Sequence, residues 1–332
     1  MIDVSHLWNA IYGNIDLKRR LISDIQSNKL LHAYIIEGPR NSGKLMLART
    51  IAASLADTSA DVKKITTATC PDVIEISLPE NRKSIGVDTV RSLKLASVVK
   101  PNDLESKVFI ISDAHLLTQQ AQNALLKLIE EPPRAVFIFL LCENAATLLP
   151  TIRSRAPILR MQIFSPEELS ELLLRYSPDA EKLYAKEREA YDVILRSSGG
   201  AYGEALWKIV DAEIKIGDLN YIVLDLLTAI CERHRAEMRK KIESFPPTRD
   251  GFYEAIYLFK LAVRDIIAYR STRGDCDYLF PKCETIGSYA GKLSLDRLLK
   301  IFDLIVDIEK DSVSNPNIQT TKTLLYTKLC LI

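Results

Sequence analysis

The segment from Ala33 to Leu45 constrains the fold more than any other part of the chain. It begins with apolar residues that predict a buried strand, continues as a loop from Gly38 to Lys44, and enters a helix rich in alanine and leucine. A strand, loop and helix in this order form a cradle for phosphate, because the amide groups of the loop and the amino end of the helix face the bound anion. The sequence therefore predicts an α/β domain built around a nucleotide phosphate site.

Five residues of this loop are the expected phosphate ligands, namely Gly38, Asn41, Ser42, Gly43 and Lys44. The glycines permit the backbone bends that turn amide groups inward, and the lysine reaches the outer phosphates. The position after the lysine normally carries a Ser or Thr whose hydroxyl binds Mg²⁺, but here it is Leu45. A leucine side chain cannot hold a metal ion, so one of the usual magnesium ligands is missing.

A second apolar segment, Val108 to Ile111, is the best candidate for the strand that supplies the other magnesium ligand. Ser112 follows it where the metal-binding aspartate is expected, and Asp113 takes the place of the carboxylate that positions water. If the register shifts by one residue, Asp113 becomes the metal ligand and Ala114 stands at the catalytic position. Both alternatives leave the pair incomplete, so we expect ATP or ADP to bind without hydrolysis and no metal site in the protein.

The composition is that of a globular protein without a strong charge bias. Hydrophobic residues make up 47% of the chain, and its formal net charge is +1, so any contact with nucleic acid has to come from a local patch or from partners. The longest apolar run, 135–142, is too short to cross a bilayer, and no signal peptide opens the chain, which predicts a cytoplasmic protein. The six cysteines lack a Cys-x-x-Cys pair; Cys276 and Cys283 are near enough in sequence to meet, yet we expect no disulfide and no zinc.

The pattern of secondary structure changes near residue 164. Before it, apolar strands alternate with helices, which is typical of a parallel sheet covered on both faces, and the polar stretch 57–69 is expected to be a loop. After it only helical patterns are found, at about 166–175, 180–197, 202–215, 218–244, 249–272, 294–311 and 319–331. A second boundary is expected near Gly217, which divides the chain into domains 1–164, 165–216 and 217–332.

Several ordered motifs in the first domain carry a family resemblance. They are the phosphate loop, Cys70-Pro71-Asp72, the segment 85–91, the segment 123–133 (Asn-Ala-Leu-Leu-Lys to Glu-Glu-Pro-Pro) and Thr151 to Arg155. Together they resemble the AAA+ subunits of bacterial clamp loaders, most closely those of the delta-prime type in DNA polymerase III. The resemblance implies an AAA+ P-loop core with a parallel sheet, followed by a small helical lid and an all-α collar that assembles a five-subunit ring.

The same resemblance implies a role and partners. Delta-prime subunits are rigid stators that help to load the sliding clamp on primed DNA, and each supplies an arginine to the nucleotide site of a neighbour. Here the motif is Ser154-Arg155-Ala156, which assigns Arg155 as the arginine finger and places Ser154 and Arg153 at the subunit interface. The implied partners are gamma/tau and delta subunits in a hetero-pentameric ring, the sliding clamp, and primer-template DNA through the assembled complex, with no membrane.

Two departures from the family bear on hydrolysis. Only Cys70 remains where the family carries a four-cysteine zinc module, and the opening of the lid helix, 199–205, lacks the arginine that senses nucleotide in motor subunits. Both argue against a motor. The alternative is a gamma/tau-type subunit that hydrolyses ATP with unusual metal ligands, and a stand-alone kinase would need an acceptor site that we do not find.

Some residues keep a structural interpretation beside the functional one. Arg155 is either a plain surface arginine or part of a local salt bridge with Glu143 or Asp113, and the histidines His32 and His115 are expected to be hydrogen-bonded parts of the structure. The basic cluster 233–241 is either a solvated helix face or a contact with DNA or a partner protein.

Overall fold

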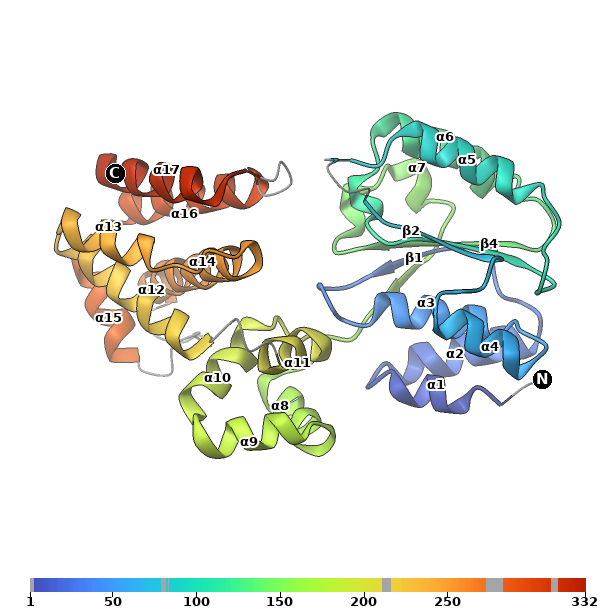
Figure 1. Cartoon of the computed structure of the whole chain (residues 1–332), viewed down its shortest axis with the longest axis horizontal. Coiled ribbons are helices and arrows are strands. Elements are labelled where there is room, and N and C mark those ends of the chain that lie inside the picture. Colours follow the sequence, from blue (N-terminus) through green and yellow to red (C-terminus); the bar gives the residue numbers. More distant parts are fainter. Residues whose placement is uncertain (1–2, 79–81, 83, 211–215, 273–282, 312–315) are drawn as a thin grey trace. The chain divides into compact units, whose positions relative to one another are not determined.

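The computed structural model describes residues 3–78, 82, 84–210, 216–272, 283–311 and 316–332 (Figure 1). They form two compact units, Met1–Ile163 and Phe164–Ile332. The first unit combines a parallel sheet with helices, and the described part of the second is helical, which confirms the predicted fold class. The proposed division of the second half near residue 217 lies inside the second unit and stays a prediction.

The sheet of the first unit has five parallel strands in the spatial order β2-β3-β4-β1-β5. Their bounds are β1 Ala33–Glu37, β2 Val73–Ile76, β3 Lys107–Ile111, β4 Val136–Cys142 and β5 Ile158–Arg160. Ile35 of β1 pairs with Leu140 of β4 on one side and with Ile158 of β5 on the other. The strand that leads into the phosphate loop therefore lies inside the sheet, with a neighbour on each side.

Helices cover both faces of this sheet, as Figure 1 shows. They are α1 Ser5–Ala10, α2 Ile15–Gln26, α3 Lys44–Ala53, α4 Ser59–Thr66, α5 Val87–Ser97, α6 Gln119–Glu130 and α7 Pro150–Arg153, with short 3-10 turns η1 Ala114–Leu116 and η2 Ala145–Thr147. Tyr34 and Ile36 of β1 join one hydrophobic cluster with the helices α1 to α4, whereas Ile35 joins a second cluster with α5 to α7. Alternate residues of a buried strand face opposite sides, which explains why this strand is apolar throughout.

The prediction of a loop at residues 57–69 is wrong, because most of this stretch is helix α4. Thr58 caps the helix by accepting a hydrogen bond from the backbone N–H of Asp61. Val62 and Ile65 are buried, three residues apart on one face, and pack into the cluster below the sheet. The apolar pattern of this helix extends over only one turn and is surrounded by Lys and Thr residues. The polar composition of the stretch therefore did not indicate a helix.

The second unit consists of helices. They are α8 Pro166–Tyr176, α9 Pro178–Lys186, α10 Arg188–Ser197, α11 Tyr202–Val210, α12 Ile216–Cys231, α13 Arg235–Glu243, α14 Arg249–Thr272, α15 Cys283–Lys292, α16 Leu295–Asp311 and α17 Ile318–Leu331. Two predicted helices are each divided in two, at Glu187 and at residues 232–234, where Arg233 has φ 55°. Cys276 and the expected loop around 274–281 lie outside the described residues, as does the side chain of Cys283. No described helix is both long enough and apolar enough to cross a membrane.

One hydrophobic cluster runs through the second unit, from Leu169 in α8 to Leu329 in α17. A buried ion pair lies within this unit: Nζ of Lys208 in α11 is 2.8 Å from the carboxylate of Glu254 in α14. The same ammonium donates a hydrogen bond to the carbonyl of Ser197 in α10 at 3.0 Å. The helices expected for the lid and for the collar thus share one core and one buried charge pair.

Asp72 anchors the loop that leads into β3. It is fully buried (0% exposed), and its carboxylate accepts hydrogen bonds from the backbone N–H groups of Asn102, Asp103 and Leu104 at 2.6–3.0 Å. Burial alone raises the pKa of a carboxyl, but these hydrogen bonds outweigh it and hold the pKa of Asp72 below its ordinary value. Because Asp72 directly precedes β2, the ionised carboxylate fixes the edge of the sheet.

We predict that Asp72→Asn lowers the free energy of unfolding by about 2 kcal/mol at pH 7, because three buried N–H groups lose an ionised acceptor. The native pKa is depressed, so this contribution is complete above the unfolded pKa of about 3.9 and is lost as the pH falls through the native value. Urea titrations of variant and unmodified protein should therefore converge below about pH 4. As a control, Asp16→Asn at a side chain that is 95% exposed should change stability by less than about 0.5 kcal/mol. A gap that stays constant down to about pH 3 would contradict the role of Asp72.

Candidate functional site

The predicted phosphate loop joins the carboxyl end of β1 to the amino end of α3. Asn41 and Gly43 have positive φ angles of 53° and 90°, which turn the chain over the start of the helix. A Cβ atom on Gly38 would lie 2.7 Å from Oγ of Ser42 and 2.8 Å from Cβ of Met161, so this position has room only for glycine. The structure thus brings the predicted phosphate ligands together in one tight loop.

Two polar groups of the loop are available to an anion. Oγ of Ser42 is buried and has no hydrogen-bond partner among the described residues. Nζ of Lys44 donates hydrogen bonds to the carbonyls of Gly38 at 2.7 Å and Pro39 at 2.5 Å. A phosphate group in the loop would give the Ser42 hydroxyl an acceptor and would offer the ammonium a charged partner in place of neutral carbonyls. The residues present therefore fit the phosphates of ATP or ADP.

Glu143 is the residue near the loop that the sequence analysis missed as a site residue. It directly follows β4, the strand beside β1. Burial lowers the pKa of Lys44, whereas the nearby Glu143, Cys142 and Asp113 raise it. The carboxyl ends of adjacent parallel strands meet at one edge of the sheet, which places both carboxylates beside the lysine. The signal was an acidic residue directly after an apolar strand, the same signal that singled out Asp113.

The loop supplies no oxygen at the position after the lysine. Leu45 is the second residue of α3 and packs against the hydrophobic cluster on that face of the sheet. Ser112 and Asp113 form a turn directly after β3, so the residue at the strand end is a serine. Among the described residues, no three His, Cys, Asp or Glu side chains are arranged to hold a metal ion. The hydroxyl of Ser42 and the ammonium of Lys44 are groups that suit a phosphate.

Glu37, the last residue of β1, braces the base of the loop. Its carboxylate accepts a hydrogen bond from the backbone N–H of Ala145 at 2.8 Å and pairs with the guanidinium of Arg160 at 2.8 Å. Ala145 opens η2 after β4, and Arg160 ends β5. One carboxylate therefore ties together the ends of three adjacent strands directly below the phosphate loop.

Arg155 lies at the end of the sheet that is formed by the amino ends of the strands. The phosphate loop lies at the opposite end, after the carboxyl end of β1. Arg155 follows α7 and precedes β5, so it is near the amino ends of the parallel strands, whereas Lys44 follows the carboxyl end of β1. Its Nε is 2.7 Å from the carboxylate of Glu130 at the end of α6, and its Nη1 donates to the carbonyl of Thr151 at 3.1 Å. The side chains of Arg155 and Glu130 are each 42% exposed.

The salt bridge of Arg155 is therefore formed with Glu130, and the partners considered from the sequence, Glu143 and Asp113, are wrong. The chain reverses direction between β4 and β5, which carries the arginine away from the loop and toward the end of α6. Ser154 accepts a hydrogen bond from Nη1 of Arg155 at 3.2 Å, and both Ser154 and Arg153 are exposed on the same surface.

The two histidines of interest have different surroundings. Nε2 of His32, just before β1, is 2.7 Å from the carbonyl of Ile129, so this histidine is part of the hydrogen-bonded structure. Nδ1 of His115, in η1, is buried without a hydrogen-bond partner in the described part of the chain. Neither imidazole is hydrogen-bonded to a residue of the phosphate loop.

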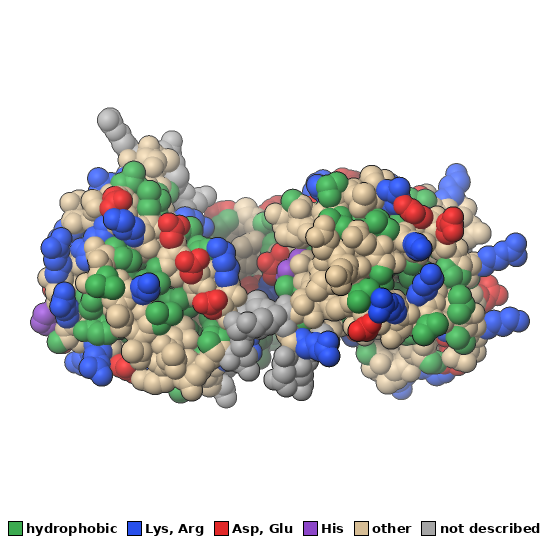
Figure 2. All heavy atoms as spheres, turned by 90° about the horizontal axis from the view of Figure 1, so that it is seen from above, with side chains coloured by type: hydrophobic (Ala, Val, Ile, Leu, Met, Phe, Trp, Pro, Cys, Tyr) green, Lys and Arg blue, Asp and Glu red, His purple; other side chains and the backbone are tan. Residues whose placement is uncertain are grey.

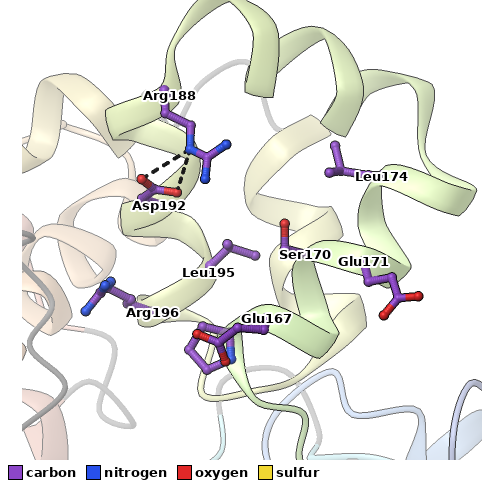
Figure 3. A pocket seen from close by; sticks show the side chains of 9 residues that line it. Glu167, Ser170, Glu171, Leu174, Arg188, Asp192, Leu195 and Arg196 are labelled. Atoms are coloured by element: carbon purple, nitrogen blue, oxygen red, sulfur yellow. Dashed lines mark hydrogen bonds and ion pairs between the residues drawn. The ribbon is translucent and has the colours of Figure 1, made fainter.

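The second unit contains a cleft of about 480 Å³ between α8 and α10 (Figure 3). It is lined by Pro166, Glu167, Ser170, Glu171, Leu174, Arg188, Asp192, Leu195 and Arg196. Arg188 forms an ion pair with Asp192 at 3.1 Å and lies over the ring of Tyr184 at 4.0 Å. Acidic and basic side chains are mixed along the lining, so no unbalanced charge selects an ion here.

Sequence comparisons relate part of the chain to subunits of DNA polymerase III. Residues 13–165 match the family described as DNA polymerase III, delta subunit. The chain is 30% identical over 194 residues to DNA polymerase III subunit gamma/tau of Mycobacterium tuberculosis and 30% identical over 178 residues to subunit delta' of Bacillus subtilis. A solved structure of a gamma subunit-related protein from Thermotoga maritima covers 94% of this chain and 97% of its own, with a TM-score of 0.46 and 20% identity.

The matched regions are partial. They comprise 55% of this chain and 33% of the mycobacterial relative, and 50% of this chain and 53% of the Bacillus one. The chain thus spans about a third of the length of the first of these relatives.

We predict that Gly38→Ala destabilises the first unit by about 1–3 kcal/mol, because the added methyl group overlaps Ser42 and Met161. The matched control is Gly86→Ala, where a Cβ meets nothing within 4 Å and φ is −80°, and we expect a change below about 1 kcal/mol. Urea unfolding, monitored through hydrogen exchange of the β1 amides, measures the stability of both variants. Equal stability of the two variants would show that the loop is looser than described.

Proposed function

We propose that this chain, which is related to the clamp-loader subunits of DNA polymerase III, is a delta-prime-like stator that helps to load the sliding clamp on primed DNA. Its own phosphate loop holds ATP or ADP without hydrolysing it, and Arg155 acts as an arginine finger on the nucleotide of a neighbouring subunit. The observation that carries this proposal is the position of Arg155 near the amino ends of the strands, at the end of the sheet opposite its own phosphate loop.

The surroundings of Arg155 suit a group that acts on another subunit. An arginine finger stabilises the charge that develops on the transferred phosphoryl group and contributes roughly a thousandfold or more in rate. The ion pair with Glu130 is half-exposed, and exposed pairs contribute less than about 1 kcal/mol, so a phosphate can replace Glu130 at little cost. Because the fold separates Arg155 from Lys44, any nucleotide it contacts belongs to another chain.

The expected lack of hydrolysis rests on two positions. Leu45 takes the place of the hydroxyl that binds Mg²⁺, and Ser112 takes the place of the aspartate at the end of β3. Magnesium that enters with ATP supplies charge neutralisation between the phosphates, but this chain offers it no direct ligand at those positions. Ser42 and Lys44 bind the phosphates, and nothing in the loop positions the metal for transfer.

The proposed partners are gamma/tau and delta subunits in a hetero-pentameric ring, with contacts to the sliding clamp and to primer-template DNA through the complex. Ser154 and Arg153 are exposed beside Arg155, so all three are accessible to an adjoining subunit. The helices from α12 onward are proposed to form the collar, and the single core of the second unit makes this collar continuous with the lid helices.

The second candidate is a gamma/tau-type motor. Two observations favour it: the relatives include gamma/tau subunits, and the carboxylates of Asp113 and Glu143 both lie near enough to Lys44 to affect its pKa. Either carboxylate could position a water molecule. The absence of a hydroxyl at Leu45 makes this candidate the weaker of the two.

Mutation of Arg155 distinguishes the two roles. We predict that the purified chain alone releases no phosphate from ATP and that it raises ATP turnover when mixed with the gamma/tau subunit of the same organism. Arg155→Ala should reduce this stimulation at least tenfold, which corresponds to about 1.4 kcal/mol in the activation barrier. Turnover is measured by phosphate release at saturating ATP.

Two variants control for loss of charge and of the ion pair. Arg91→Ala removes an exposed arginine that pairs with Asp88 and should leave stimulation unchanged. Glu130→Gln frees the guanidinium of Arg155 from its carboxylate and should keep full stimulation. Stimulation that survives Arg155→Ala in an intact complex would disprove the arginine-finger assignment.

A further inference from the structure

Two acidic residues follow the strands beside the phosphate loop. The backbone N–H of Gly38, the first residue of the loop, donates a hydrogen bond to the carbonyl of Cys142 at 3.1 Å, and Glu143 comes next in the chain. On the other side of β4 lies β3, and Asp113 follows the last residue of β3 by two positions. Both carboxylates therefore belong to the carboxyl end of the sheet, which is the end that carries the loop.

The groups that attract phosphate lie inside the loop. A Cβ atom on Gly38 would lie 2.7 Å from Oγ of Ser42, so the turn is tight, and this hydroxyl is buried without a partner among the described residues. Lys44 opens α3, a helix of ten residues whose amino end attracts phosphate through its dipole. The attraction is thus concentrated where the α- and β-phosphates of a nucleotide bind in such a loop.

A γ-phosphate would lie beyond Lys44, at the ends of β3 and β4. Phosphate loops that hydrolyse ATP hold Mg²⁺ there through a hydroxyl and a carboxylate, and the metal neutralises the charge of the third phosphate. In this chain those two positions are Leu45 and Ser112, whereas Asp113 and Glu143 bring negative charge to the same end of the sheet. Like charges repel more strongly where part of the water is excluded, so a third phosphate meets repulsion.

This negative pair is a local feature of the first unit. Residues 1–163 contain 20 Lys or Arg and 16 Asp or Glu, and Figure 2 shows basic and acidic side chains interspersed over the visible face of this unit, at right. Burial lowers the pKa of Lys44, and the charges of Glu143 and Asp113 oppose this shift, which agrees with their place at the ends of the adjoining strands. The repulsion therefore acts on the outer end of a bound nucleotide and not on anions in general.

We propose that the phosphate loop selects nucleoside diphosphates over triphosphates, and that Asp113 and Glu143 are the residues that exclude the third phosphate group. Ser42, Lys44 and the amides of the loop hold the two inner phosphates. This inference rests on the nucleotide site of the proposed function and names its ligand. A loop that holds a diphosphate has no γ-phosphate to release, so such a subunit keeps one nucleotide while its neighbours turn over ATP.

Isothermal titration calorimetry of the full chain with ADP and with ATP, each with excess Mg²⁺, tests this inference. We predict that ADP binds at least about tenfold more tightly than ATP, because the γ-phosphate meets two carboxylates. Asp113→Asn with Glu143→Gln removes both charges at nearly constant size and should raise the affinity for ATP at least about fivefold. The affinity of this variant for ADP should change less than about twofold, which also shows that the variant is folded.

The matched control removes two carboxylates at the opposite ends of the same strands. Glu105 precedes β3 and Glu131 precedes β4, and both side chains are exposed. Glu105→Gln with Glu131→Gln lowers the negative charge of the unit by the same amount and should leave both affinities unchanged.

Equal affinities for ADP and ATP, or tighter binding of ATP, would overturn the inference and leave the proposed nucleotide site standing. The inference also fails if Asp113→Asn with Glu143→Gln narrows the difference between ADP and ATP no more than the control does. If neither nucleotide binds at millimolar concentration, the proposed nucleotide site fails together with the inference.

Discussion

The pairing of β1 with β4 on one side and β5 on the other is the constraint on which the first unit depends. It places the phosphate loop at the carboxyl edge of the sheet, where Glu37 ties the ends of these strands together through Ala145 and Arg160. The same pairing brings the residues after β3 and β4 beside Lys44. A loop of seven residues thus has a fixed base, and Asn41 and Gly43 turn it over the helix with positive φ angles.

Because all strands are parallel, the sheet has two chemically different ends, one formed by the carboxyl ends of the strands and one by their amino ends. One end presents amide groups, Ser42 and Lys44 to a phosphate; the other presents Arg155 in an exposed pair with Glu130. In the proposed function, a single chain of this kind holds one nucleotide and acts on another, which suits a ring of neighbouring subunits.

Features set by neighbours in sequence could be predicted, and those set by tertiary packing could not. The strand, loop and helix around Lys44 follow from glycine spacing and apolar runs, and the capping box of Ser165 with Glu168 marks the start of α8 in both sequence and structure. Helix α4 was missed because burial of Val62 and Ile65 outweighs a polar composition. Glu130 as the partner of Arg155 was missed because it depends on how α6 and α7 end near each other, which no local pattern reports.

Titration of ATP into the purified chain, by calorimetry together with phosphate release in the presence of Mg²⁺, tests most directly whether the loop is a phosphate cradle without a working metal site. We predict that ATP and ADP bind, that Lys44→Ala abolishes this binding, and that no phosphate is released. Phosphate release by the unmodified chain alone would show that Leu45 and Ser112 do not silence the site. Failure of either nucleotide to bind at millimolar concentration would show that the loop is structural only.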